Sequence, residues 1–345
     1  MLAAVWTGVN AIALREVPVP QISGHEVLLK VWSVGVCATD LEIVSGIFEY
    51  GKPPHVLGHE IAGEVVEIGA EVTAWKPGDR VVVETSIGCG HCKACRNGDR
   101  HLCPDMTEIG FTPHPGGYAQ YVKTPADNLV RIPDNVSYDE AGILESVVCP
   151  VGSLMRLGVR FGETVLVYGC GPAAIAFMQG ARAMGAGKII VAGRNADALA
   201  RTKDFGADVL INTTEENFLS RLLAETDGAG ADLVCEAAGS PQTIGWAFET
   251  VRRAGRVILY GIPPKDALVP LPTVSIIMNQ LEVYGTVGNP HVWEPLLRLI
   301  SKGSIDLKSM VTATMPLTRI ADAFALLQDK ARKPIKIVLH PWDEA

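Results

Sequence analysis

The spacing of apolar and polar residues divides the chain near residue 164. Before that point, short apolar runs at 26–32, 61–69 and 79–84 are separated by stretches rich in glycine and proline. Short strands between turn-forming residues are typical of an irregular, barrel-like β domain. The first part of the chain is therefore predicted to form such a domain.

From residue 164 onward, apolar runs alternate with helical stretches. The run 164–168 leads into a glycine-rich turn and an Ala-rich helical stretch over 175–184. Further apolar runs follow at 188–192, 209–211, 232–235, 256–260 and 281–284. This alternation predicts a doubly wound parallel sheet, so the fold class is α/β. After about residue 290, the chain has two amphipathic helical stretches and the apolar run 335–339. Periodicity alone does not show where in the fold these segments lie.

Length and charge exclude several classes of protein. With 345 residues the chain has room for two domains, and its net charge of −8 opposes binding to a polyanion such as a nucleic acid. No apolar run reaches the roughly 18 residues of a membrane helix, and the first residues lack the pattern of a signal peptide. We therefore expect a cytoplasmic protein with a small-molecule partner, and neither a nucleic-acid nor a membrane partner.

A glycine-rich turn follows the first strand of the second part. Its sequence, Gly-Cys-Gly-Pro-Ala-Ala, is a G-x-G-x-x-A form of the dinucleotide fingerprint. Between a strand and a helix, such glycines allow a tight turn and let a pyrophosphate approach the helix N-terminus. The predicted cofactor-binding residues of this turn are Gly169, Gly171, Pro172, Ala173 and Ala174.

The end of the next strand predicts which dinucleotide binds. An acidic residue about 20 positions after the fingerprint accepts the ribose 2′-hydroxyl of NAD. This chain has Gly193 and Arg194 there instead. Because a guanidinium pairs well with a 2′-phosphate, NADP is favoured over NAD. The alternative is that Arg194 is only a solvated residue at the start of a helix that Asp197 caps.

Four of the eight cysteines form a compact cluster in a polar loop. They are Cys89, Cys92, Cys95 and Cys103. Four closely spaced thiolates suit a closed, tetrahedral, structural zinc site, which has no open position for a substrate. The alternatives are disulfides or an iron–sulfur cluster, although bacterial clusters use three residues rather than seven before the fourth cysteine.

A second, dispersed set of metal-binding residues precedes and follows this loop. Cys37, His59, Glu60 and Glu145 each have an ordinary explanation alone, since a lone cysteine is usually a small core residue. Together they offer sulfur, nitrogen and carboxylate oxygen. Such a mixed set is typical of a catalytic zinc that keeps one position for water or substrate.

Further motifs resemble those of a known protein family. They lie at 35–40, 58–60, 63–66, 77–81 and 116–119, and they occur in the same order along the chain as in that family. With the motifs above, the chain resembles the zinc-dependent medium-chain alcohol and polyol dehydrogenases, in a sorbitol dehydrogenase-like or threonine dehydrogenase-like branch. The resemblance implies a chaperonin-10-like (GroES-like) catalytic domain over 1–146 and 290–345, a Rossmann domain over 147–289, and an active site in the cleft between them.

The resemblance also implies roles for single residues. Cys37 and His59 correspond to zinc ligands, and either Glu60 or Glu145 is the third ligand. Thr39 corresponds to the hydroxyl beside the zinc that passes the substrate proton outward. The strand end that carries Thr286 and Val287 lies against the nicotinamide in the family. Many relatives complete the proton relay with a histidine, and this chain has Glu42 in its place.

The expected function is a zinc-dependent oxidoreductase with two zinc ions per chain. It transfers a hydride between a secondary alcohol, of polyol or sugar-like type, or its ketone and NADP(H). The alternatives are an NAD-dependent polyol dehydrogenase, a reductase that consumes NADPH, or a non-catalytic nucleotide-binding relative. A zinc-loop nucleic-acid binder is disfavoured by the acidic charge. A homodimer or homotetramer is expected from the family.

Overall fold

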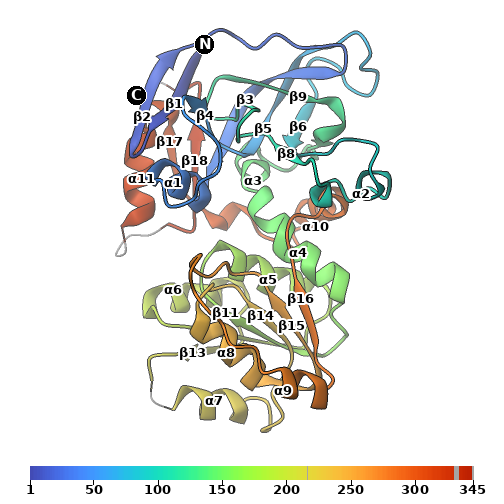
Figure 1. Ribbon diagram of the computed structural model, residues 1–345, viewed down its shortest axis with the longest axis vertical. Helices are drawn as coiled ribbons and strands as arrows, with labels where there is room; N and C mark the ends of the chain where they lie inside the picture. Colours follow the sequence, from blue (N-terminus) through green and yellow to red (C-terminus); the bar gives the residue numbers. More distant parts are fainter. Residues whose placement is uncertain (216, 330–333, 344–345) are drawn as a thin grey trace. The chain divides into compact units, whose positions relative to one another are not determined.

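The computed structural model describes residues 1–215, 217–329 and 334–343, and the chain forms two compact units (Figure 1). Unit 1 comprises Met1–Ser146, Asn289–Gly303 and Leu307–Ala345, and unit 2 comprises Val147–Gly288 and Ser304–Asp306. Unit 1 therefore draws on both ends of the chain. Among the described residues, no helix has both the length and the apolar character needed to cross a membrane.

Unit 1 is built around a seven-stranded sheet in the order β10-β6-β5-β3-β18-β17, with β9 also paired to β3. The unit also contains a three-stranded sheet, β2-β1-β4, and the pair β7-β8. The strands are β1 (Leu2–Gly8), β2 (Ala11–Glu16), β3 (Glu26–Val36), β4 (His55–Val56), β5 (Glu60–Ile68), β6 (Arg80–Val83), β7 (Ser86–Ile87), β8 (Thr107–Glu108), β9 (Tyr121–Pro125), β10 (Leu129–Arg131), β17 (Val311–Pro316) and β18 (Lys336–His340). The predicted irregular β domain is confirmed.

Helices of unit 1 are short and lie between or after these strands. They are α1 (Ala38–Ser45), α2 (Lys93–Arg96), α3 (Tyr138–Gly142), α10 (Trp293–Ser301) and α11 (Ile320–Gln328). A further helix, α4 (Glu145–Leu157), begins in unit 1 and continues into the sequence of unit 2. The core of unit 1 combines apolar residues of β3, β5 and β6 with residues of α11 and β18.

The apolar run near the C-terminal end completes the large sheet. Strand β18 pairs antiparallel with β3, where Ile337 lies opposite Val36 and Leu339 lies opposite Val34. On its other side β18 pairs in parallel with β17. Residues about 300 positions apart in sequence therefore become neighbours in one sheet, which periodicity alone does not indicate.

Unit 2 is a six-stranded parallel sheet in the order β13-β12-β11-β14-β15-β16. Its strands are β11 (Thr164–Tyr168), β12 (Lys188–Gly193), β13 (Val209–Asn212), β14 (Ala231–Glu236), β15 (Val251–Leu259) and β16 (Glu282–Gly285). Its remaining helices are α5 (Pro172–Ala183), α6 (Ala196–Arg201), α7 (Phe218–Ala224), α8 (Pro241–Thr250) and α9 (Thr273–Met278). This is the strand order of a dinucleotide-binding Rossmann sheet.

The strands of unit 2 are apolar on both faces because each face is covered. In β11, Val165 and Val167 belong to one core, which includes Phe177 of α5. The alternate residues Leu166 and Tyr168 belong to a second core on the other face. Successive side chains of a strand point to opposite faces, so a continuous apolar run fits a sheet covered on both sides. The predicted doubly wound sheet is confirmed.

Candidate active site and metal centres

The first candidate ligand, Cys37, lies where β3 ends and α1 begins. It is the N-cap residue of α1, and its backbone N–H donates to Asp40 Oδ2 at 3.3 Å. The half-buried Thr39 follows two residues later, with its Oγ1 3.6 Å from Cys37 Sγ. The start of this helix therefore places the sulfur and the hydroxyl next to each other.

The second and third candidate ligands lie at the start of β5. His59 precedes the strand and Glu60 begins it, in register with Gly35 of β3. Position 35 requires glycine, because a Cβ there would collide with Glu60 Oε2. The pairing of β3 with β5 thus brings Cys37, which follows β3, close to His59 and Glu60 at the start of β5.

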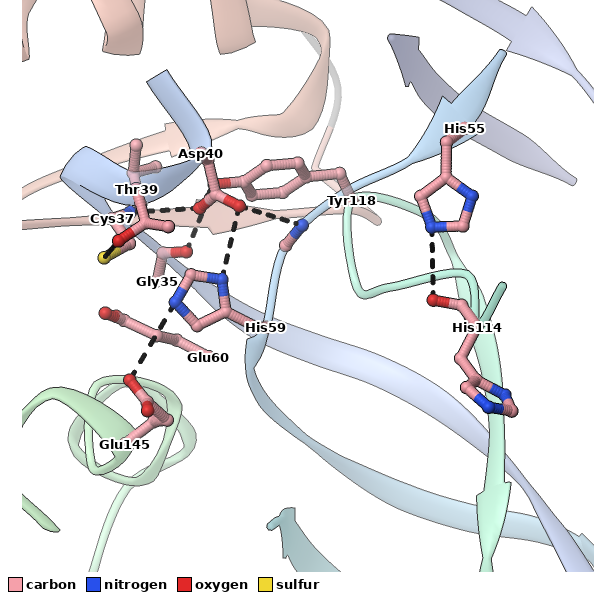
Figure 2. A network of polar contacts seen from close by, with 12 residues as sticks. Gly35, Cys37, Thr39, Asp40, His55, His59, Glu60, His114, Tyr118 and Glu145 are labelled. Carbon is pink, nitrogen blue, oxygen red and sulfur yellow. Dashed lines mark hydrogen bonds and ion pairs between the residues drawn. The ribbon is translucent and has the colours of Figure 1, made fainter. Parts of the chain in front are cut away.

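His59 is held from one side by a buried carboxylate (Figure 2). Its Nδ1 lies 3.3 Å from Asp40 Oδ1, and Tyr118 donates its hydroxyl to Asp40 Oδ2 at 2.7 Å. Burial disfavours the charged ring, but the nearby Asp40 and Cys37 outweigh burial and raise the pKa of His59 well above its usual value. The arrangement leaves Nε2 as the ring nitrogen for a metal, with Asp40 in the orienting role that carboxylates have beside zinc-binding histidines.

The donor atoms fit a catalytic zinc ion. One ligand atom from each of Cys37, His59 and Glu60 lies within 4.8 Å of the others. Glu60 is fully buried, and its Oε2 has no hydrogen-bond partner among the described residues. A buried carboxylate oxygen without a partner is costly unless a cation or donor meets it. The mixed set of S, N and O atoms is the one that leaves a zinc position open.

The other oxygen of Glu60 is paired with a buried lysine. Lys336 of β18 donates its ammonium group to Glu60 Oε1 at 2.5 Å and to the carbonyl of Val36 at 3.3 Å. Sequence reasoning missed this residue. Its signal was a single lysine inside the apolar run 335–339, since lysine is almost never fully buried unless it is paired.

Glu145 lies beside the three-residue set rather than within it. It is the first residue of α4, and its Oε2 is 3.9 Å from His59 Nε2 (Figure 2). Burial raises the pKa of Glu145 to about 7. Of the two carboxylates considered as third ligand, Glu60 therefore belongs to the set whose ligand atoms lie close together. Glu145 approaches His59 Nε2 from α4.

The four cysteines of the polar loop converge as well. Their sulfur atoms lie within 4.8 Å of one another, and none of the eight cysteines, all of which lie in the described residues, forms a disulfide. Backbone N–H groups of His91 and Cys92 lower the pKa of Cys89 to about 6. Similar N–H···S contacts of 3.4 Å join Cys95 to Cys92 and Cys89 to Cys103. Four closely spaced thiols, with backbone donors that favour a thiolate, fit a structural zinc ion.

The glycine-rich turn of unit 2 lies between β11 and α5. Gly169 has a φ of +118°, which favours glycine, and Gly171 is the N-cap of α5 with Pro172 following it. Apart from its neighbours in the chain, no atom of the described residues lies within 4 Å of the position that a Cβ would take at Gly171. Ala173 is half-buried and Ala174 is buried in the core beneath. The turn therefore presents backbone and open space, as pyrophosphate binding requires.

Gly193 ends β12 at the same edge of the sheet, and Arg194 follows it. A Cβ at Gly193 would collide with the Cys170 sulfur, which explains the glycine. Arg194 is exposed. The cap of α6 is Asn195, whose Oδ1 accepts from Ala198 N–H at 2.9 Å, so the alternative in which Asp197 caps this helix is wrong.

Thr286 and Val287 follow the end of β16. Because β16 is parallel to its neighbour β15, they lie at the carboxyl edge of the sheet, as do the ends of β11 and β12. Thr286 Oγ1 accepts a hydrogen bond from Ser153 Oγ at 2.7 Å, and Val287 is exposed. All predicted cofactor residues are thus near the edge where open α/β sheets bind their ligands.

Comparison with known proteins agrees with this geometry. Residues 23–134 match the Alcohol dehydrogenase GroES-like domain, and residues 172–302 match the Zinc-binding dehydrogenase family. Sorbitol dehydrogenase of Bacillus subtilis is 33% identical over 99% of this chain and 97% of its own length. L-threonine 3-dehydrogenase of Bacillus licheniformis is 34% identical over 90% of this chain and 91% of its own.

Solved structures with the same fold hold either nicotinamide cofactor. A protein from Sinorhizobium meliloti 1021, described as a zinc-binding dehydrogenase with NADP bound, superposes with a TM-score of 0.92 at 27% identity, and 99% of each chain is covered. A short chain alcohol dehydrogenase from Escherichia coli CFT073, complexed with NADH, has a TM-score of 0.91 at 28% identity, again over 99% of each chain.

Proposed function

This chain belongs to the zinc-dependent medium-chain dehydrogenase family and is an oxidoreductase, and from that premise we propose that it oxidises a secondary alcohol of polyol or sugar-like type with NADP, or reduces the matching ketone. The observation that carries the proposal is the convergence of Cys37, His59 and Glu60 on one point, with an unpartnered carboxylate oxygen among them. A nucleotide-binding relative without catalysis has no use for this set.

The proposed reaction converts alcohol and NADP⁺ into ketone, NADPH and a proton. Cys37, His59 and Glu60 would hold the zinc ion, and its Lewis-acid chemistry would make a bound hydroxyl easier to deprotonate. Asp40 and Tyr118 keep the His59 ring in its ligand orientation. The glycine-rich turn of unit 2 would hold the dinucleotide, whose nicotinamide would supply the hydride acceptor.

Thr39 receives the substrate proton in this proposal. Its hydroxyl lies 3.6 Å from Cys37 Sγ and is half-buried, so it can exchange protons with both the site and solvent. Glu42 is exposed and three residues further along α1, and residues at this spacing share a face of a helix. We propose that Glu42 passes the proton to water, in place of the histidine of many relatives.

Zinc analysis tests the proposal. The wild-type protein is expected to hold about two zinc ions per chain, while Cys37→Ser keeps about one and loses dehydrogenase activity because the catalytic set loses its sulfur. Cys149→Ser is the matched control, since Cys149 belongs to neither set, and it should retain both ions and the activity. A single zinc ion in the wild type that survives Cys37→Ser would favour the nucleotide-binding module instead.

The preference for NADP is proposed from Arg194. It is exposed at the end of β12, where the ribose of the cofactor is expected, and one similar structure holds NADP. Arg194→Glu should lower kcat/KM with NADP about 10–100-fold, because it replaces a phosphate-pairing group by a like charge, and should leave NAD use almost unchanged. Lys203→Glu makes the same charge change elsewhere on unit 2. Equal loss with both cofactors in Arg194→Glu would contradict the assignment.

A further inference from the structure

Glu236 is a fully buried carboxylate that the proposed hydride transfer does not use. It is the last residue of β14, inside unit 2. Glutamate is almost never fully buried unless its carboxylate is paired. Burial raises the pKa of Glu236, while hydrogen bonds from Thr243 and from backbone N–H groups oppose this rise. The role of the carboxylate therefore depends on the groups that donate to it.

Three donors from the segment after β14 converge on one oxygen of Glu236. The backbone N–H groups of Ala238 and Gly239 each donate to Oε1 at 2.9 Å. Thr243, in the first turn of α8, donates its hydroxyl to the same oxygen at 2.8 Å. Hydrogen bonds to an ionised carboxylate are stronger than those between neutral groups. Glu236 therefore holds residues 237–239 and the start of α8 in one arrangement.

The segment after β15 is fitted to the same residue. The backbone N–H groups of Tyr260 and Gly261 donate to the Glu236 carbonyl at 3.0 Å. A Cβ at Gly261 would collide with the Gly239 nitrogen and would lie 2.8 Å from Glu236 Oε2, so this position requires glycine. Glu236 therefore contacts two segments that follow neighbouring strands of the sheet.

Residues 237–239 lie directly beside the glycine-rich turn after β11. The Ala237 N–H donates to the carbonyl of Tyr168, the last residue of β11, at 2.9 Å. A Cβ at Gly169 would lie 3.2 Å from the Ala237 carbonyl and 3.5 Å from the Ala238 nitrogen. Ala238 is exposed. The two segments are therefore neighbours at the carboxyl edge of the sheet.

The chain changes direction across the sheet between these two segments. In the order β13-β12-β11-β14-β15-β16, the chain runs outward from β11 to β13 and then returns to β14 on the other side of β11. Open α/β sheets bind their ligands outside the carboxyl ends of the strands at such a reversal. Residues 169–171 and 237–239 therefore flank the place where this rule puts the dinucleotide.

We propose that Glu236 is a positioning residue for the dinucleotide, because its carboxylate holds residues 237–239 beside the glycine-rich turn. The inference rests on the proposed function, in which the dinucleotide is the hydride acceptor. Glu236 acts through the backbone of this segment, and it is required as a hydrogen-bond acceptor rather than as a charge. Without the acceptor, the N–H groups of Ala238 and Gly239 lose their partner and the segment is free to shift.

Binding of NADPH, or of NADH if the wild type binds it more tightly, tests this role by nucleotide fluorescence on the zinc-loaded protein. Glu236→Leu removes the acceptor and should weaken binding about 10–100-fold. Glu236→Gln keeps an acceptor oxygen on a side chain of the same length and should stay within about threefold of the wild type. Equal weakening in both variants would overturn the inference, since the charge would then be responsible. Unchanged binding by a Glu236→Leu protein that circular dichroism shows to be folded would overturn it as well.

A pair of threonine variants leaves the carboxylate in place and decides the question if Glu236→Leu does not fold. Thr243→Val removes one donor to Glu236 and should raise the KM for the dinucleotide about 3–10-fold, with kcat within about twofold of the wild type. Thr250→Val is the matched control, because Thr250 is buried at the other end of the same helix and donates to the Trp246 carbonyl at 2.7 Å. An unchanged KM in Thr243→Val, or an equal change in Thr250→Val, would overturn the inference.

Nucleotide binding also separates this inference from the proposed function. Binding that depends on Glu236, in a protein that oxidises no secondary alcohol, would support the inference and refute the proposed reaction. Turnover of a secondary alcohol, with equal nucleotide binding by the wild type and Glu236→Leu, would support the reaction and overturn the inference. A wild type that binds neither nucleotide would overturn both.

Discussion

At the scale of single residues, Lys336 balances the charge of the metal site. Its side chain is only 4% exposed, and it supplies the positive partner of the fully buried Glu60. Burial lowers the pKa of Lys336, but the negative charges of Glu60, Cys37 and Glu145 outweigh burial and raise this pKa above its usual value. A buried carboxylate that loses its only charged partner is strongly destabilising, unless another cation takes that place.

Lys336→Met is therefore expected to destabilise the zinc-free protein by about 3–5 kcal/mol and the zinc-loaded protein by less. The reason is that bound zinc compensates Glu60, whereas the zinc-free variant leaves its charge unpaired. Calorimetric melting with and without zinc measures the difference, with the exposed Lys302→Met as control. An identical loss in both states would show that Lys336 does not act through Glu60.

At the scale of elements, the four-cysteine loop is a segment without a core. No residue over 87–102 is buried, so the loop has little apolar contact to hold its shape. Its two ends are tied by the short pair β7 and β8. The order of the loop therefore depends on these two short strands.

Cys95→Ser should release one zinc ion and expose the loop. We expect limited proteolysis to cut within residues 88–106 at least ten times faster than in the wild type, because structural zinc contributes folding energy directly. Mass spectrometry of the fragments and zinc analysis check this. Cys235→Ser, in the core of unit 2, is the control. A variant that keeps both zinc ions and resists the protease would refute a metal in this loop.

The end of β18 is linked to α3 by a histidine. His340 Nε2 lies 2.8 Å from Asp139 Oδ1, and Nδ1 lies 3.0 Å from Asp343 Oδ2. The Asp139 contact is the largest cause that raises the pKa of His340 above its usual 6.5. A raised pKa means that the folded state binds the proton more tightly. The link thus stabilises the fold fully below pH 6.5 and loses its effect as the pH rises through the higher folded value.

Asp139→Asn should therefore lower the melting temperature more at pH 5.5 than at pH 9. The expected difference corresponds to about 0.5–1 kcal/mol, since both side chains are partly exposed to solvent. Calorimetry across this range, at low ionic strength, measures it. Asp134→Asn, an exposed residue before α3, serves as control. A loss that grows towards high pH would contradict the assigned direction.

The strands of the two units differ in how far the sequence alone predicts their arrangement. The strands of unit 2 and its glycine-rich turn follow one another within short intervals, so apolar runs and glycine spacing suffice. Unit 1 is different, because β3 gathers β5, β9 and β18 from distant parts of the chain. The donor types and the family resemblance predicted Cys37, His59 and Glu60 as candidates, but neither predicted Lys336, whose partner Glu60 is 276 positions away.

At the scale of the whole molecule, unit 2 has an exposed apolar surface at one edge of its sheet. Strand β16 is an edge strand among the described strands, and α9 precedes it. Large apolar side chains are exposed on α9 and β16, namely Val274, Ile277, Met278 and Val283, and others on the segments before and after them, namely Ile262, Leu268, Leu271 and Val287. A large apolar patch beside an unpaired strand edge favours a partner with the same surface. We therefore expect a second copy of this chain to cover it.

The double variant Val274→Glu, Ile277→Glu should shift the protein from the expected homo-oligomer to a smaller species. Two buried charges at the contact cost several kcal/mol, enough to dissociate it at micromolar concentration. Light scattering on a sizing column measures the mass. Val9→Glu with Val19→Glu is the control, since both residues are exposed on unit 1. A wild-type monomer, or a mass unchanged by the double variant, would contradict this contact.

The pairing of β18 with β3 has a consequence for biosynthesis. All of unit 2 is translated before β18, so the Rossmann sheet can fold on the ribosome while the sheet of unit 1 still lacks an inner strand. Glu60 meets Lys336 only after the nascent chain has grown by 276 further residues. The metal site is therefore among the last parts of the molecule to mature, and a chain that stops before residue 336 carries Cys37, His59 and Glu60 without the charge that balances them.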